Sequence, residues 1–406
     1  MISKGLLEKL YQAATIQRWN DHVRPCELTE LDKQAHKMAI SYVIAKFEQT
    51  DRRADIDWLK IIEGGIFEFL HRVILTDIKP MVFHRMMSQK GRELNEFVLE
   101  QINGDIKGIP GGFTDRFRSY LFDPEFAFTE KRILGAAHYL ATNWEFRIIY
   151  HLNPFIQGIE KTRAEIENRL EDYYDLIGVQ KINLGRKSFG FIDLCGQLRF
   201  QKRWSGTPRI PQTSVLGHML IVAMLSYLCS IQTGACSRRK YNNFFAGLFH
   251  DLAEVLTRDI ISPVKKSVKG LKKIIKEYEQ IQVEESLLPL LPQSWHAEVK
   301  LFIEDEFENK IVDRGEVVKG VSAEQLQTRY NHDRYFPVDG QIIRACDELS
   351  AFIEATLSIN YGIKSPHLVQ AIRHLTHRYS SSIVQGIDFG RLFNYFKQEA
   401  GSDFLE

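Results

Sequence analysis

The sequence lacks several features that would mark a specialised class of protein. It has only five cysteines, an odd number with no C-x-x-C spacing, which is typical of reduced cytosolic thiols that fill a core. It has no excess of charge of one sign, because 53 Lys and Arg stand against 52 Asp and Glu, a net charge of +1. We therefore expect no nucleic-acid or membrane partner, although local basic patches are compatible with this balance.

Long hydrophobic runs are scarce as well. Residues 1–19 lack the apolar stretch of a signal peptide. The longest strongly apolar run, Met219–Cys229, is too short to cross a bilayer. The composition, with 44% hydrophobic and 26% charged residues, is that of a soluble globular protein. These features predict a soluble, cytoplasmic protein.

Strand signals are few, and helical periodicity is present along most of the chain. Alternating patterns bounded by tight hairpin turns are scarce. Apolar residues recur at three- and four-residue spacing in six long segments, and the twelve prolines fall mainly between such segments. The segments are residues 5–19, 36–49, 163–178, 217–230, 271–291 and 342–359. We predict an all-α fold.

Comparison of the chain with itself indicates an internal duplication. At 406 residues the chain is long enough for two domains. Three pairs of segments match in the same order and at nearly the same spacing along the chain, and such near-equal spacing indicates a repeat. The pairs are 6–19 with 191–204, which both end in Arg-Trp, the segments around His36 and His218, and 65–82 with 247–264. We predict two tandem helical domains, residues 1–182 and 183–406.

A fourth pair of segments matches at a larger spacing. Residues 133–146 resemble residues 342–355, which lie further along the chain than the first three pairs predict, so the second copy carries extra residues. The charged stretch 304–336, which has no periodic pattern, is the best candidate for this insertion. We expect it to be an exposed loop.

The two copies differ where chemistry would be done. His218, His250, Asp251 and Asp347 in the second copy stand where the first has His36, Glu68, Phe69 and His138. Two imidazoles and two carboxylates on separate helices form a mixed N/O set that suits a divalent transition metal or Zn²⁺. The phenylalanine would remove a central carboxylate from the first copy. A residual three-ligand site at His36, Glu68 and His138 is the alternative to ordinary core histidines there.

A further carboxylate follows the His-Asp pair in the second copy. Glu254 lies four residues after His250, which would place both on one helix face. From there it could reach a metal-bound water without being a ligand, as a general acid/base should. In the first copy Arg72 replaces Glu254, while Asp77 keeps the position of Asp259. We predict that the second copy is active and that the first is degenerate.

As an ordered set, these motifs resemble the HD-superfamily phosphohydrolases, and within them the HD-domain 5′-deoxynucleotidases. The resemblance is specific over residues 191–264, has an echo around 346–352, and reaches the N-terminal half only as a degenerate repeat. The residues that carry it are Arg203, Trp204, His218, His250, Asp251, Glu254, Asp259, Pro263, Val264, Lys265 and Asp347. A lone His-Asp dipeptide would be weak evidence for this family, whereas the complete ordered set of residues is specific evidence.

The resemblance implies tandem HD-type bundles of α-helices, with one divalent ion in the second: Mn, Co, Zn, Fe, Ni or Mg. The implied ligands are His218, His250, Asp251 and Asp347. It also implies that Arg203 binds phosphate and that Trp204 lies against the sugar, which favours 2′-deoxyribose. Because Arg-Trp recurs at Arg18-Trp19 in the degenerate copy, a purely structural role for the pair is the alternative.

The remaining implied roles concern the end of the motif and the residue before the first histidine. Glu254 and Asp259 would act at the hydrolytic water and the leaving group or position the sugar. Lys265 either contacts the phosphate or is solvated at a helix start. Many relatives have an acidic residue where this chain has Gly217, which removes a side chain that could orient a metal ligand.

The expected function is release of phosphate from nucleoside 5′-monophosphates, with deoxyribonucleotides preferred. Two alternatives remain: another HD phosphohydrolase, such as a triphosphohydrolase or cyclic-nucleotide phosphodiesterase, and a non-catalytic nucleotide-binding regulator. A triphosphate would need more cations than the motif region offers, which has mainly Arg203, Arg209, Arg258 and Lys265. The expected partner is the nucleotide substrate, and the protein would act as a monomer or homodimer.

Overall fold

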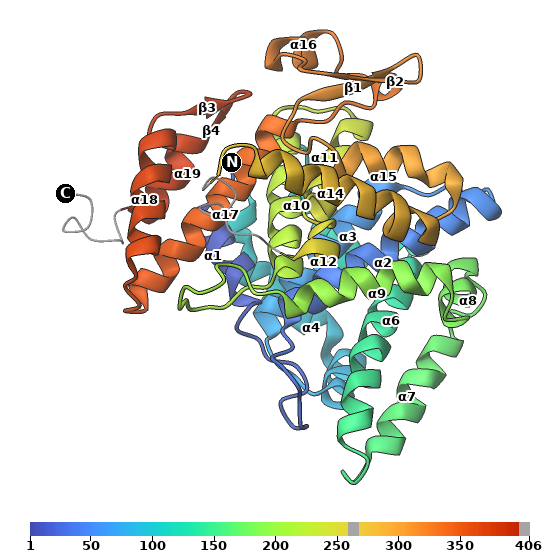
Figure 1. Cartoon of the computed structure of the whole chain (residues 1–406). Helices are drawn as coiled ribbons and strands as arrows, with labels where there is room; N and C mark the ends of the chain where they lie inside the picture. The colour runs from blue at the N-terminus through green and yellow to red at the C-terminus, as the bar shows by residue number, and fades with distance from the viewer. Residues whose placement is uncertain (259–267, 398–406) are drawn as a thin grey trace.

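Helices account for almost all of the regular structure in the computed structural model, which confirms the predicted all-α class (Figure 1). The structure describes residues 1–258 and 268–397. In the first half the helices are α1 (Lys4–Gln12), α2 (Glu30–Asp51), α3 (Trp58–Leu75), α4 (Pro80–Ile106), α5 (Phe113–Phe122), α6 (Phe128–Leu152), α7 (Ile159–Glu171) and α8 (Ile177–Asn183). In the second they are α9 (Lys187–Gln197), α10 (Val215–Gln232), α11 (Ser237–Phe249), α12 (Glu254–Thr257), α14 (Leu271–Gln282), α15 (His296–Ile303), α16 (Ala323–Thr328), α17 (Gly340–Asn360), α18 (Pro366–Tyr379) and α19 (Phe389–Lys397).

Two long buried helices, α2 and α10, pack against each other at the centre of the molecule. Each begins at a hydroxyl side chain that accepts a hydrogen bond from the first turn: Thr29 from the Asp32 backbone N–H, and Ser214 from that of Gly217. By length and composition alone, α10 could cross a membrane. It is 94% buried within the protein, which is the behaviour of a core helix in a soluble protein.

The apolar core continues across the predicted boundary between the two halves. The ring of Tyr42 on α2 lies 5.0 Å from that of Phe245 on α11, and the ring of Phe47 lies 4.6 Å from that of Trp295. The division between positions 182 and 183 stays a prediction. What the structure adds is that side chains from both halves share one core.

The inserted stretch 304–336 is folded, so its prediction as a loop is wrong. It contains the antiparallel hairpin of β1 (Lys310–Asp313) and β2 (Glu316–Lys319), followed by α16 (Figure 1). A small separate core of Ile311, Val321 and Leu326 holds it together. A second hairpin, β3 (Ile383–Val384) with β4 (Ile387–Asp388), connects α18 to α19.

Local features recur between the halves at the spacing of the first matched pair, 6–19 with 191–204. The backbone bridge between Gln17 and Thr29 is repeated between Lys202 and Ser214. Thr29 and Ser214 also cap α2 and α10, so this register makes Lys33 the counterpart of His218. These features favour a register that differs by three positions from the predicted match of His36 with His218. Such a shift is close to one helical turn and preserves the apolar pattern.

Candidate metal centre

Three packed helices position the predicted ligands. His218 is in the first turn of α10, His250 caps the end of α11, and Asp347 is in the second turn of α17. Helices α10, α11 and α17 are in mutual contact. Asp251 follows His250 in the turn that leads to α12.

The structure brings three of the four predicted ligands into one cluster. Nε2 of His218 lies 3.0 Å from Oδ1 of Asp347, and ligand atoms of His218, His250 and Asp347 all lie within 4.8 Å of one another. Asp251 adjoins them, since its Oδ2 is 3.0 Å from Nε2 of His250 and 3.9 Å from Nε2 of His218. Within residues 1–258 and 268–397, no other His, Cys, Asp and Glu side chains form such a group.

The histidine ring nitrogens in the cluster fit a metal ion. Nε2 of His218 and of His250 is buried and has no hydrogen-bond partner of acceptable geometry among the described residues. Nδ1 of His218 lies 3.0 Å from Oγ of Ser350, and Nδ1 of His250 lies 2.8 Å from the Gly247 carbonyl oxygen. An acceptor at Nδ1 keeps the proton there and leaves the Nε2 lone pair for a ligand.

The spacing of the ligand atoms fits as well. Two atoms bound to one ion at about 2.1 Å each are at most about 4.2 Å apart. The three closest nitrogen–oxygen separations in the cluster, 3.0, 3.0 and 3.9 Å, satisfy this limit. One divalent ion could be held by His218, His250 and Asp347, and Asp251 as the fourth ligand stays a prediction.

The two histidines of the cluster differ in their pKa shifts, and the two aspartates have lowered pKa values. Burial lowers the pKa of His218, and Arg203 lowers it further. Burial also lowers the pKa of His250, but Asp251 outweighs burial and raises it to about 9. Burial raises the pKa of Asp251 and Asp347, yet the neighbouring histidines hold both below their usual range. At pH 7 the metal-free cluster carries one protonated histidine beside two carboxylates.

Metal binding at pH 7 is expected to release about one proton. His250 must lose its proton before Nε2 can bind an ion, whereas His218 is already neutral. Apparent affinity should therefore rise about tenfold per pH unit below the His250 pKa and level off above about pH 9. Titration calorimetry in buffers of different ionisation enthalpy measures the number of protons released per bound ion. Release of no proton, or of two protons, would contradict this assignment of charges.

Glu354, which sequence reasoning missed, holds the Arg-Trp pair beside the cluster. It is fully buried in α17, and although burial raises its pKa, neighbouring guanidinium groups lower it to about 2. Its carboxylate accepts hydrogen bonds from Nε of Arg203 at 3.3 Å and Nε1 of Trp204 at 2.8 Å. The terminal nitrogens of Arg203 lie 3.9 Å from Oδ2 of Asp251 and 3.8 Å from Oδ1 of Asp347. The Arg203 guanidinium thus lies against the two carboxylates of the predicted ligand set.

The same arrangement of an arginine, a tryptophan and a buried glutamate recurs in the first half. Nε of Arg18 and Nε1 of Trp19 each donate to Glu145 at 2.9 Å. Since that half lacks the ligand set, the recurrence supports the structural alternative for Trp204, whose contact with the sugar stays a prediction. Glu145 and Glu354 occupy equivalent positions in the fourth matched pair, 133–146 with 342–355, which is the signal that could have identified Glu354.

Glu254 lies beside the cluster, but not on the helix that carries His250. Helix α11 ends one residue before His250 and α12 begins at Glu254, so the predicted shared helix face is wrong. Backbone hydrogen bonds of three-residue spacing tighten the intervening turn. The turn nevertheless places Glu254 with His250 and Asp251 in the lining of a cavity of about 270 Å³. Asp259 and Lys265 lie outside the described residues.

The wall of this cavity is acidic, which sequence reasoning also missed. Its described lining carries the carboxylates of Asp251, Glu254, Glu279, Glu304, Asp305, Glu306 and Glu308 and the cations of Lys276 and Arg344. Burial raises the pKa of Glu306. Asp305 accepts hydrogen bonds from Lys276 and Lys319. An exposed loop over 304–336, as the sequence predicts, gives no reason to place residues 304–308 in a cavity.

Gly217 has a packing reason in this chain. A Cβ there would lie 2.8 Å from Oδ1 of Asp32 on α2. The Asp32 carboxylate accepts a hydrogen bond from the hydroxyl of Ser214, so it is turned to the helix cap rather than to His218. Helix α2 therefore occupies the space that an acidic side chain at position 217 would need.

Two buried lysines lie near the first-half positions that the repeat aligns with the ligand set. Lys33, equivalent to His218, contacts Nδ1 of His138, and Nζ of Lys37 donates to Glu68 at 2.9 Å. Both lysines are fully buried. Burial lowers the pKa of Lys33 well below its usual range. Two lysine side chains thus fill the region of the first half where the second half gathers its predicted metal ligands.

Of the two readings of the first-half histidines, the structure favours core histidines over a residual three-ligand site at His36, Glu68 and His138. Nε2 of His36 lies 2.7 Å from the carbonyl oxygen of Ile192, which identifies a hydrogen-bonded core histidine. Burial lowers its pKa to about 3, so the ring is neutral. The three side chains form no metal-binding group in the part of the chain that the structure describes.

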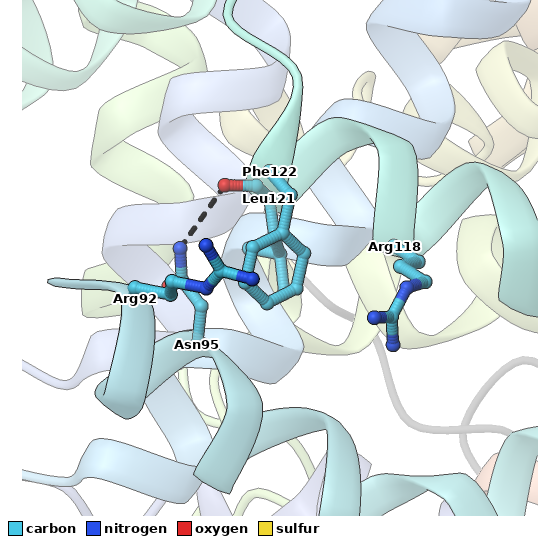
Figure 2. Close-up of a pocket in the computed structure, with 5 residues that line it drawn as sticks. All are labelled: Arg92, Asn95, Arg118, Leu121 and Phe122. Carbon is cyan, nitrogen blue, oxygen red and sulfur yellow. Dashed lines mark hydrogen bonds between the residues drawn. The ribbon is translucent and has the colours of Figure 1, made fainter.

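A second cavity, of about 420 Å³, lies in the first half (Figure 2). It is lined by Arg92, Asn95, Arg118, Leu121 and Phe122. Asn95 donates to the Leu121 carbonyl oxygen at 3.0 Å, and the Arg118 guanidinium lies 5.3 Å from the centre of the Phe122 ring (Figure 2). Its described lining has no histidine, cysteine or carboxylate, so we assign it no chemistry.

Comparison with known proteins agrees with the location of the cluster. Residues 195–376 match the HD domain family. No curated protein matches the chain. The matched segment contains all four predicted ligands and also Arg203, Trp204 and Glu254, whereas the first half lies outside it. The match supports membership of the HD superfamily for this part of the chain.

Proposed function

We propose, from the HD domain at residues 195–376, that the protein is a metal-dependent phosphohydrolase that releases phosphate from nucleoside 5′-monophosphates. The HD domain indicates a metal-dependent phosphohydrolase in general. The observation that carries the proposal is the cluster of His218, His250 and Asp347, with Asp251 and Arg203 against it. A preference for deoxyribonucleotides rests on the resemblance of the Arg-Trp pair to that of 5′-deoxynucleotidases.

The side chains around the cluster provide the groups that phosphate ester hydrolysis needs. His218, His250 and Asp347, with Asp251 beside them, would hold a divalent ion, which would lower the pKa of a bound water and polarise a phosphoryl oxygen. Arg203 presents a planar fork that matches phosphate oxygens and neutralises their charge. Glu254 accepts the proton of the attacking water and returns it to the sugar oxygen as the bond from phosphorus to that oxygen breaks. Water is thus added across one P–O bond, and inorganic phosphate and a nucleoside are formed.

The acidic cavity wall supports a monophosphate over a triphosphate. Seven carboxylates and two cationic side chains line the described part of the cavity. A triphosphate would bring several negative charges toward this wall, and like charges at close range repel. A monophosphate could place its single phosphate at Arg203 and turn its neutral sugar and base, which donate hydrogen bonds, to the carboxylates.

The N-terminal half is, in this proposal, a degenerate HD-like copy that binds no metal. The bridges and caps that recur at the same spacing in both halves support a duplication, and the buried Lys33 and Lys37 support the loss of the metal. All five cysteines are free thiols, which supports a reducing, cytoplasmic location. The partner would be the nucleotide, without nucleic acid or membrane, and the protein would be a monomer or homodimer.

Phosphate release across deoxy- and ribonucleoside mono- and triphosphates and cyclic nucleotides, with Mn²⁺, Co²⁺ or Zn²⁺, tests the proposal. We expect turnover of monophosphates, faster with deoxyribose, and little turnover of triphosphates. Cleavage of triphosphates or cyclic nucleotides alone would favour the other HD phosphohydrolases. Nucleotide binding without turnover of any substrate would favour the regulatory alternative.

A further inference from the structure

A side chain of the N-terminal half is linked to the metal cluster through one intervening serine. Tyr11 on α1 is buried, and its hydroxyl donates to the carbonyl oxygen of Ser350 at 3.1 Å and lies 2.9 Å from Oγ of the same residue. Ser350 is fully buried on α17, three residues after Asp347. Its Oγ is 3.0 Å from Nδ1 of His218. A continuous hydrogen-bonded path therefore runs from α1 to a predicted metal ligand.

The donors and acceptors along this path are consistent with metal binding by His218. If Nε2 binds the ion, Nδ1 carries the ring proton and donates it to Oγ of Ser350. The Ser350 hydroxyl can then donate to the oxygen of Tyr11, whose own proton goes to the Ser350 carbonyl oxygen. Each of the three protons has one acceptor, so the path fixes both the tautomer and the orientation of the imidazole.

The path exists only in the half that has the ligand set. In the register of the two helix caps, Tyr11 corresponds to Gly196. In the register of the fourth matched pair, Ser350 corresponds to Ala141. Neither Gly196 nor Ala141 has a side-chain polar atom. The contact is therefore not a feature that the repeated fold itself requires, and it coincides with the metal ligands.

We propose that Tyr11 is a positioning residue of the metal centre, so that the N-terminal half completes the site through Ser350 and His218. The inference rests on the proposed function, because it needs a metal at His218. It gives the first half a role beyond packing: a residue outside the matched HD domain sets the ligand geometry within it. Partners that orient a ligating histidine typically contribute about 10–100-fold to metal affinity.

Metal affinity of the full-length chain tests this proposal. Tyr11→Phe removes one oxygen and is expected to weaken Mn²⁺ or Co²⁺ binding about tenfold, and Ser350→Ala by a similar or larger factor. The double variant should lose no more than about the worse single variant, since both changes cut the same path. Thermal unfolding of the metal-free proteins provides the second readout.

Tyr42→Phe is the matched control, because it removes another buried tyrosine hydroxyl, one that donates to Glu298 at 3.1 Å. We expect it to lower the unfolding temperature of the metal-free protein about as much as Tyr11→Phe and to leave metal affinity unchanged. Equal metal affinity in Tyr11→Phe and wild type would overturn the role proposed for Tyr11 and leave the proposed function standing. If Tyr11→Phe fails to fold, an unchanged affinity in Ser350→Ala overturns it. A wild-type protein that binds no metal would overturn the proposed function as well.

Discussion

Removal of residues 1–185 is expected to leave an aggregating fragment without activity, although the fragment keeps the whole matched HD domain. Phe245 and Trp295 would lose the rings of Tyr42 and Phe47 that cover them. Leaving one large apolar side chain exposed costs about 1.5–3 kcal/mol. Exposure of several such residues along the shared core is therefore comparable to a typical total stability of about 5–15 kcal/mol.

Size-exclusion chromatography and phosphate-release assays of the fragment measure this outcome. Co-expression of residues 1–185 and 186–406 as two chains is the control, because it cuts the backbone and keeps the shared core. We expect the pair to form a soluble complex with activity. A monodisperse, fully active fragment beginning near Lys187 would show that the first half is an independent domain.

The largest catalytic effect is expected from Glu254→Gln. The amide keeps the size of the side chain but cannot take a proton from water, so turnover should fall on the order of 10²-fold or more. Metal content should be unchanged, because Glu254 lines the cavity beside the ligands without joining their cluster. Measurement of kcat together with bound metal separates the two properties.

Glu277→Gln on α14 is the matched control for this variant. Glu277 lies outside the cavity lining and forms a surface ion pair with Lys273 at 3.5 Å, so its loss should leave kcat near the wild-type value. Loss of both metal and activity in Glu254→Gln would instead make Glu254 a ligand or a structural support. A turnover close to wild type would exclude it as the general acid/base.

Most helices could be predicted because their apolar spacing extends over many turns, and the exceptions have local causes. In the hairpin, each strand has only four residues, and β2 is exposed throughout, so no alternation of apolar and polar residues builds up. Its two-residue turn, Arg314-Gly315, has positive φ at both positions, a turn type that glycine favours. The sequence Asp-Arg-Gly-Glu at residues 313–316 is therefore the sequence feature that could have indicated this hairpin turn.

The register between the two halves was harder to predict than the helices. Matching of apolar positions tolerates a shift of three or four residues, because such a shift keeps the same helix face. The polar caps at Thr29 and Ser214 define the register instead, since each sits at one fixed place in its helix.

The ligand residues could be predicted because few side chains can bind a divalent ion, so histidine and carboxylate positions are informative. The side chains that orient these ligands through hydrogen bonds could not be predicted. Almost any polar side chain can serve as a hydrogen-bond partner, and Tyr11 is 339 residues from Ser350 in the chain. The same applies to Glu354, which is 151 residues from Arg203. Only the fold brings these residues together.

The central claim is a single metal ion held by His218, His250, Asp251 and Asp347. Anomalous diffraction from crystals of the full-length protein grown with Mn²⁺ or Zn²⁺ tests it most directly, with Asp251→Ala crystals alongside. We predict one strong peak per chain, about 2.0–2.2 Å from ligand atoms of all four residues in the wild type, and a lost or much weaker peak in Asp251→Ala. No peak among these side chains, or an equally strong peak in Asp251→Ala, would contradict the account.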